Sequence, residues 1–231
     1  VYQEEIERLV GDHNQQGAHG EIYALDGKAI RGVRKKDDPI SEYALSVYDV
    51  QQGKVMSQVE VGRKENEISK AHEALKLVNI SGKVLTGDAM HTHKRLATQI
   101  LEGQGDFVFP VKENQEKLYK NIQSLFAPEY PKPGFGKIQT DFQRAQKVNK
   151  GHGRLEVRTI QTSEMLNSYS GWPGLAQVYR LNREIQWWRG GKCYRTSSEV
   201  EFGITSLSCK KTSPLQLLEI RRAHWGIETG L

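Results

Sequence analysis

The order of strand-like and helix-like segments over residues 21–126 most strongly limits the fold of this chain. Short β-type segments come first, and the helical spacing of apolar residues appears only after residue 65. From there helix-like and strand-like segments alternate, with glycines between them. The predicted strands are 21–27, the two arms of a hairpin over 43–61, 83–89 and 105–112, and the predicted helices are 65–78, 93–103 and 114–126.

This order of elements is that of the ribonuclease-H-like fold. Three antiparallel strands come first, and strand–helix–strand connections then add parallel strands to the same sheet. We therefore predict an α/β protein with a mixed sheet and flanking helices. In a sheet of this topology the first and fourth strands are neighbours.

A β-rich stretch interrupts the pattern before the last helix. It opens with APEYPKPGFG, rich in proline and glycine, and continues with strand-like segments at 154–162, 175–185 and 193–207. Helical spacing resumes after Ser213 and Pro214, which suit an N-cap and a first helical position. We predict a helix end and loop at 1–20, a ribonuclease-H-like core at 21–126, a β-rich insertion at 127–212 and a final core helix at 213–231, which we expect to be truncated.

Composition narrows the class of protein only mildly. The net charge of +5 and the pI of about 9.1 favour an anionic partner such as nucleic acid. No stretch approaches the roughly 20 apolar residues that span a bilayer, and no signal-peptide pattern is present. Cys193 and Cys209 fit no zinc spacing. We expect a cytoplasmic protein with two reduced thiols and no membrane association.

Three acids stand where the predicted fold can bring them together. Asp26 ends the first predicted strand, Asp88 ends the fourth, and Glu228 lies on the last helix, which can pack across the same sheet. Carboxylate oxygens are the ligands that Mg²⁺ and Mn²⁺ prefer, and two such ions can stabilise both oxygens of an in-line phosphoryl transfer. Each acid also has a simpler interpretation: a turn at Asp26-Gly27, a helix cap at Asp88 and a solvated surface acid at Glu228.

Five motifs follow one another along the chain: ALDGKAIRG, LTGDAMHTHK, FVFPVKENQ, GHGRLEVRTI and RRAHWGIE. In this order they resemble the motifs of DDE-type insertion-sequence transposases, most of all the group that includes the H-repeat-associated proteins. The resemblance implies a ribonuclease-H-like core, a Mg²⁺ or Mn²⁺ cofactor, and Asp26, Asp88 and Glu228 as catalytic metal ligands. It also implies that water cleaves the DNA at transposon ends and that the freed 3′-hydroxyl then attacks target DNA. The implied protein is a homodimer on DNA, located in a bacterial cytoplasm and associated with the nucleoid when it is bound to DNA.

The motif around Glu228 departs from the family pattern Y-x2-R-x3-E-x6-K. Arg221 stands at the Tyr position, His224 stands at the Arg position, and the Lys position lies beyond Leu231. We expect Arg221 or Arg222 to take over contact with DNA phosphate. Two alternatives remain open: a nuclease of the same fold without strand transfer, and an inactive or domesticated DNA-binding remnant.

Basic side chains near the motifs are candidates for DNA contact. Lys28 and Arg31 closely follow the first acid, although a solvated loop would also explain them. His91 and His93 form an H-x-H pair that lacks the further ligands that zinc needs. The predicted DNA-binding residues are Lys28, Arg31, His91, Lys112, Arg154, Arg221, Arg222 and His224.

The β-rich stretch contains a rival acid and two tryptophans. Glu156 is the alternative third acid, although Arg154 and Arg158 alternate with it at β-spacing and would share its face. Trp187 and Trp188 stand beside a predicted turn. They could stack on an unpaired base or pack in the core.

Overall fold

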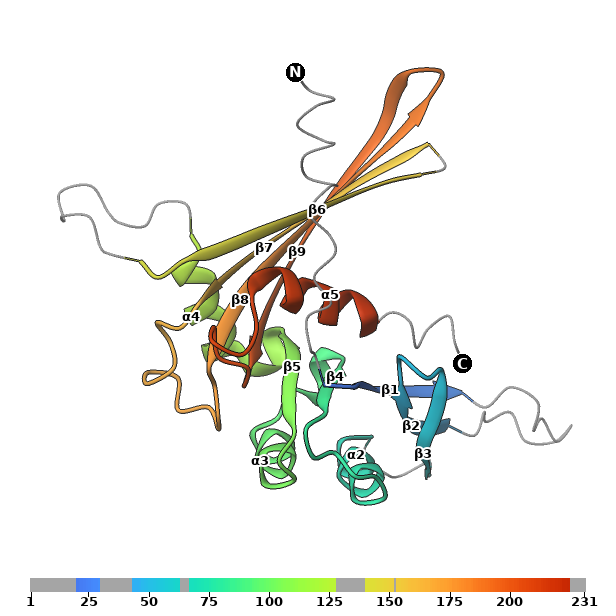
Figure 1. The fold of residues 1–231 in the computed structure, drawn as a ribbon, viewed down its shortest axis with the longest axis vertical. Coiled ribbons are helices and arrows are strands. Elements are labelled where there is room, and N and C mark those ends of the chain that lie inside the picture. Colours follow the sequence, from blue (N-terminus) through green and yellow to red (C-terminus); the bar gives the residue numbers. More distant parts are fainter. Residues whose placement is uncertain (1–19, 30–42, 63–66, 128–139, 152, 225–231) are drawn as a thin grey trace, which may run out of the picture.

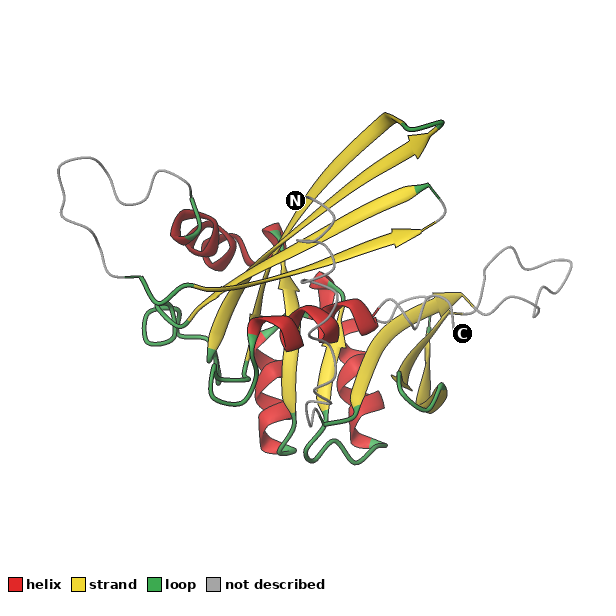
Figure 2. Cartoon of the chain, turned by 45° about the horizontal axis from the view of Figure 1, so that its top comes forward, coloured by secondary structure: helices red, strands yellow, loops and turns green. Residues whose placement is uncertain are grey.

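The computed structural model describes residues 20–29, 43–62, 67–127, 140–151 and 153–224. In these ranges nine strands form one sheet, with helices on both faces (Figures 1 and 2). No helix in the described ranges is long and apolar enough to cross a membrane. The elements are β1 (Ile22–Ala29), β2 (Tyr43–Asp49), β3 (Lys54–Val61), α2 (Glu67–Lys76), β4 (Val84–Gly87), η1 (Ala89–His91), α3 (Lys94–Glu102), β5 (Asp106–Val111), η2 (Glu113–Gln115), α4 (Glu116–Leu125), β6 (Gln143–Gly151), β7 (Arg154–Ser163), β8 (Gln177–Arg189), β9 (Lys192–Thr205) and α5 (Pro214–His224).

The first five strands form a mixed sheet in the order β3-β2-β1-β4-β5. β1, β2 and β3 pair antiparallel, whereas β4 pairs parallel with β1 and β5 pairs parallel with β4. The parallel ladder between β1 and β4 runs from Ile22 opposite Val84 to Leu25 opposite Gly87. The predicted element order β-β-β-α-β-α-β-α is therefore confirmed.

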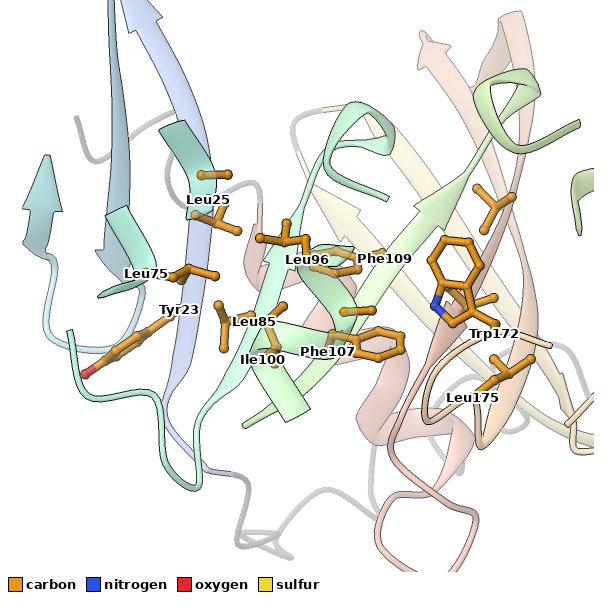
Figure 3. Close-up of a cluster of buried hydrophobic side chains, with 14 of the residues drawn as sticks. Tyr23, Leu25, Leu75, Leu85, Leu96, Ile100, Phe107, Phe109, Trp172 and Leu175 are labelled. Atoms are coloured by element: carbon orange, nitrogen blue, oxygen red, sulfur yellow. The ribbon is translucent and has the colours of Figure 1, made fainter. Parts of the chain in front are cut away.

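Alternating side chains on the central strands build one core on each face of the sheet. Phe107 and Phe109 of β5 join a cluster with residues of α2, α3 and α4, whereas Val108 between them joins a cluster with Leu217 and Leu218 of α5. Figure 3 shows part of the first cluster, in which Leu96 and Ile100 pack on the sheet. In Figure 1, α5 lies on one side of β4 and β5, and α2 and α3 lie on the other. We call these two sides the α5 face and the α3 face.

The β-rich stretch adds four strands to the same sheet. β9 pairs antiparallel with β5, from Val108 opposite Thr205 to Val111 opposite Phe202, and β8, β7 and β6 follow outward in that order. The sequence predicted strands here but not their pairing with the core sheet. The far ends of these strands extend beyond the rest of the fold (Figures 1 and 2). The α5 face therefore continues from β1 and β4 onto the added strands.

Helix α5 begins at the predicted residues. The Ser213 backbone N–H donates to Gln216 Oε1 at 2.8 Å, and the Gln216 N–H donates to Ser213 Oγ at 3.4 Å. This reciprocal cap and the fixed backbone of Pro214 set the start of the helix. Leu217, Leu218 and Ile220 are fully buried against the sheet. The apolar contact fixes α5 on the face to which Asp26 and Asp88 belong, as shown below.

Candidate active site

Asp26 and Asp88 lie on neighbouring parallel strands, each one residue past the last paired position. Leu25 and Gly87 form that last pair. Because successive residues of a strand point to opposite faces, Asp26 lies on the face of Ala24, and Asp88 on the face of Thr86. The Thr86 hydroxyl oxygen lies 3.1 Å from His224 Nδ1 of α5, which identifies this as the α5 face. The strand order therefore brings both carboxylates to one place on that face.

Neither aspartate has the simpler role that its local sequence allows. Asp26 and Gly27 lie within β1, opposite Ser46 and Leu45 of β2, so they do not form a turn. Asp88 precedes η1, but its side chain makes no capping hydrogen bond. The Asp88 side chain is 67% exposed. It is therefore open to a ligand from solvent.

The imidazole of His224 is close to the Asp88 carboxylate. Its Nε2 lies 3.6 Å from Asp88 Oδ1. This interaction with His224 holds the pKa of the Asp88 carboxyl below its usual range, although burial of the group opposes the shift. Asp88 is consequently ionised at neutral pH, which is the state that a cation ligand requires.

The chemistry of Asp26 and Asp88 can be compared with the needs of a divalent cation. Two carboxylates from adjacent strands are the hard oxygen donors that Mg²⁺ and Mn²⁺ prefer. Within the described ranges, no group of three Asp, Glu, His or Cys residues could hold a metal ion. Glu228, the predicted third ligand, lies outside the described residues. Asp26 and Asp88 therefore fit such a cation as two of its ligands.

Glu156 does not suit the role of rival third acid. Its buried carboxylate contacts Arg158 at 2.7 Å and Arg154 at 3.3 Å, and it also accepts a hydrogen bond from Arg183. Burial raises the pKa of Glu156, but the hydrogen bond and the three positive charges outweigh it and hold this pKa below its usual range. Three guanidinium groups already neutralise the carboxylate, an arrangement that disfavours a metal ligand, and the role of Glu156 as an alternative third acid stays a prediction. The predicted face shared with Arg154 and Arg158 is confirmed.

Three residues of the predicted DNA-contacting set are buried. The His91 side chain is 1% exposed and lies 3.5 Å from Glu67 Oε1. The Arg221 side chain is 4% exposed, and its Nε and one terminal nitrogen donate to the two carboxylate oxygens of Glu201, each at 2.9 Å. His224 is buried as well. In this structure other side chains cover these groups, which disfavours contact with phosphate, and their DNA contacts stay a prediction.

Three other predicted residues lie at the surface. Lys112 is exposed and, together with Asp88, lines a cleft of about 640 Å³. Arg154 remains half exposed although it contacts Glu156, and Arg222 remains partly exposed. The side chain of Lys28 and the whole of Arg31 lie outside the described part of the structure. DNA contact stays a prediction for all five basic residues.

The two tryptophans lie near the tip of the β8–β9 hairpin and differ from each other. The Arg195 guanidinium carbon lies 4.6 Å from the centre of the Trp187 ring. The Trp188 ring is exposed, and the strand register shifts between the two residues. Trp188 is therefore open for stacking, whereas Arg195 covers a face of Trp187. Base stacking remains a prediction.

Sequence reasoning missed the side chains that hold the loop after Asp88. The Thr92 hydroxyl, fully buried, donates to the Pro110 carbonyl oxygen at 2.6 Å. Asn114 Nδ2 and Gln115 Nε2 donate to backbone carbonyl oxygens of the same loop at 2.7 and 2.9 Å. The loop is thus tied to β5 and to η2. The available signal was the polar side chains of Thr92, Asn114 and Gln115, which lie within five residues of the ends of β4 and β5.

Replacing Thr92 with valine tests this support. We expect Thr92→Val to lower the free energy of unfolding by about 1–2 kcal/mol, because it removes a buried hydrogen bond at nearly constant volume. Urea unfolding followed by circular dichroism measures the change. Thr98→Val is the matched control, since that hydroxyl donates to the Lys94 carbonyl oxygen on the exposed side of α3. Equal losses in the two variants would contradict the assigned role of Thr92.

Comparison with known proteins places this chain among mobile-element proteins. Residues 18–231 match the protein family described as "Transposase DDE domain". YncI of Escherichia coli O157:H7, provisionally named a transposase, is 29% identical over 222 residues, which cover 92% of this chain and 53% of that protein. The H repeat-associated protein YhhI of Escherichia coli K12, also provisionally named a transposase, is 28% identical over 163 residues, which cover 68% of this chain and 42% of that protein.

The chain spans about half the length of the curated relatives it matches. YncI of Escherichia coli K12 is 34% identical over 140 residues, covering 60% of this chain and 54% of that protein. Among solved structures, the cryo-EM structure of the piggyBac transposase synaptic complex with hairpin DNA matches 91% of this chain and 39% of that chain. Its sequence identity is 13% and its TM-score is 0.45, a similarity too distant to carry a structural argument.

Proposed function

This chain belongs to the transposase DDE domain family, and from that membership we propose that it catalyses metal-dependent cleavage and strand transfer of DNA at transposon ends. Asp26, Asp88 and Glu228 are the proposed catalytic acids and Mg²⁺ or Mn²⁺ ligands. The observation that carries the proposal is the position of Asp26 and Asp88, side by side just past the β1–β4 parallel ladder. The order β3-β2-β1-β4-β5, with its mixed directions, supports a ribonuclease-H-like core.

The choice of Glu228 as third acid rests on its distance from His224 in the sequence. His224 ends the described part of α5 and contacts Asp88. Residues four positions apart share one side of a helix. A helix that continued past His224 would therefore bring Glu228 to the side that faces Asp88. The three arginine partners of Glu156 support the choice of Glu228 over that acid.

The proposed reaction exchanges phosphodiester bonds in two steps. A water oxygen attacks the phosphorus at the transposon end, the bond from phosphorus to the 3′-oxygen breaks, and a 3′-hydroxyl is released. That hydroxyl then attacks a target phosphorus, and the 3′-oxygen of the target leaves. Divalent cations bound here would supply the positive charge that stabilises the attacking and leaving oxygens. The chain itself would present the carboxylates of Asp26 and Asp88 from neighbouring strands, and Lys112, which lines the same cleft as Asp88, would contact a phosphate of the DNA.

Incubation with Mg²⁺ and duplex DNA that carries the ends of the encoding element tests the proposal. We expect nicks at the element ends and, with added target DNA, covalently joined products. Cleavage without joining would establish the nuclease alternative. DNA binding without metal-dependent cutting would establish the inactive remnant and overturn the proposal. Sedimentation of the same mixture tests the proposed dimer on DNA.

Lys112→Ala is expected to weaken DNA binding and to reduce its dependence on salt. A lysine that neutralises one phosphate contributes about one unit to the slope of log binding constant against log salt concentration. Fluorescence anisotropy over a salt series measures this slope. Lys76→Ala is the control, because Lys76 is exposed on α2, behind the sheet. A Lys112 variant with the wild-type slope would exclude this contact.

A further inference from the structure

Three polar side chains lie behind the acids and take no part in the proposed chemistry. Tyr43 of β2, Glu67 at the start of α2 and His91 of η1 meet on the α3 face, and we call them the backing cluster. Tyr43 Oη donates to the Gly27 carbonyl oxygen at 2.9 Å. Glu67 Oε1 lies 3.5 Å from His91 Nε2, and their side chains are 13% and 1% exposed. Burying such groups costs stability, so their position needs a reason.

Two members of the backing cluster, Glu67 and Tyr43, lie against β1 beside Asp26. A Cβ atom at Gly27 would lie 2.5 Å from Glu67 Oε1 and 2.5 Å from Tyr43 Oη. Such distances are shorter than van der Waals contact, so a side chain at position 27 would require Glu67 and Tyr43 to move. The backbone that follows Asp26 therefore has Glu67 packed behind it and Tyr43 hydrogen-bonded to it.

The third member supports β4 beside Asp88 in the same way. A Cβ atom at Gly87 would lie 3.3 Å from both Cβ and Cδ2 of His91. The His91 backbone N–H also donates to the Asp88 carbonyl oxygen at 2.9 Å. The Glu67–His91 contact thus connects the backbone beside one acid to the backbone beside the other.

The acids need such a connection because the sheet does not supply one at their position. The parallel ladder between β1 and β4 ends at Leu25 and Gly87, one residue before each acid. The pKa of Tyr43 is raised by burial and then by the negative charges of Glu67, Asp26 and Asp88, in agreement with a close grouping of the four side chains.

We infer that Glu67 and His91 form a strut that sets the separation of Asp26 and Asp88, and that Glu67 is a positioning residue for cation binding. The inference rests on the proposed function. Glu67 is not itself a ligand, because its carboxylate approaches Gly27 from the α3 face and the two acids lie on the α5 face. It acts through the backbone of β1 and through His91.

Mn²⁺ binding to the whole chain, measured from the electron paramagnetic resonance signal of free Mn²⁺, tests the strut. We expect Glu67→Ala to raise the Mn²⁺ dissociation constant about tenfold or more, as removal of groups that orient ligands does at other metal sites. Glu67→Gln should stay within about threefold of wild type, because its side chain has nearly the same shape and fills the same space beside His91. Glu73→Ala, an exposed acid of the same helix, is the matched control and should bind Mn²⁺ as wild type does.

Each outcome either supports the strut or overturns it. A natively folded Glu67→Ala variant with wild-type Mn²⁺ affinity would overturn the strut, and so would a Glu67→Gln variant as weak as Glu67→Ala, since charge would then be the cause. Should Glu67→Ala fail to fold, Glu67→Asp keeps the charge but shortens the reach by one methylene, and unchanged affinity in that variant overturns the inference. Failure of the proposed function would give a different result, in which the wild-type protein and Asp88→Asn bind Mn²⁺ equally poorly. That result would overturn the proposed function and, with it, this inference.

Discussion

Asp88→Asn is expected to slow metal-dependent DNA cleavage by about 10³-fold, equivalent to about 4 kcal/mol of transition-state stabilisation. The substitution removes one negative charge from the proposed cation site. The fold should survive, because the Asp88 side chain is mostly exposed and makes no capping hydrogen bond. Single-turnover cleavage of end-bearing DNA in Mg²⁺ measures the effect, and circular dichroism verifies the fold. Asp26→Asn should behave in the same way.

Asp106→Asn provides a matched control for these variants. Asp106 begins β5, at the opposite end of the parallel strands, and its Oδ1 accepts a hydrogen bond from Ser206 Oγ at 2.7 Å. Asparagine can accept the same hydrogen bond, so cleavage should change by no more than a few fold. Wild-type cleavage by Asp88→Asn would exclude Asp88 as a metal ligand and would remove the basis of the proposed function.

Glu201→Ala is expected to lower the free energy of unfolding by about 3–5 kcal/mol, the usual cost of leaving a buried charge without its partner. The Arg221 guanidinium is buried and donates twice to Glu201, and the Tyr179 hydroxyl donates to the same carboxylate at 3.2 Å. The carboxylate joins α5 to β8 and β9, so its loss also loosens the helix that leads to Glu228. Urea unfolding measures the loss.

Glu199→Ala separates this effect from a general loss of surface charge. Glu199 lies two residues earlier on the same strand and the same face, but its side chain is 71% exposed and lies 3.8 Å from Arg183. Exposed pairs contribute about 0–1 kcal/mol, so this variant should be nearly neutral. Adding Arg221→Met to Glu201→Ala should recover much of the stability, because an apolar side chain of similar length has no charge to leave unpaired. Equal losses in Glu199→Ala and Glu201→Ala would contradict the role of the buried pair.

The periodic spacing of apolar residues made the helices and strands of the core predictable. Strand β6 shows that a strand with few apolar residues cannot be predicted in this way. β6 was missed because its residues, QRAQKVNKG, contain few apolar side chains at alternate positions. It is the outermost strand of the sheet, so it has one strand neighbour and needs little apolar surface. The pairing of β5 with β9 joins residues about a hundred positions apart, and no local pattern marks such a contact.

The two aspartates were predictable because strand order alone brings them together, whereas the basic residues were not. Arginine and histidine are expected at the surface unless a buried partner holds them. Glu201 is that partner for Arg221 and Glu67 lies against His91, each more than 15 residues away in the sequence. Spacing around the HWGIE motif therefore indicated which residues stand at the family positions, but not that they point inward.

The junction between β5 and β9 has a consequence for how this domain can diverge. In the described sheet, four residue pairs join the added strands to β5, from Val108–Thr205 to Val111–Phe202, and β5 in turn pairs with β4. The free end of the β8–β9 hairpin lies about ten residues from this junction along either strand. If one residue is inserted or deleted in β8 together with its partner in β9 at that end, the register of the remaining pairs is unchanged. Each side chain nearer the junction then stays on the same face of the sheet. The length of the β8–β9 hairpin, and with it the surface of the outer strands, can therefore change without altering the distance between Asp26 and Asp88.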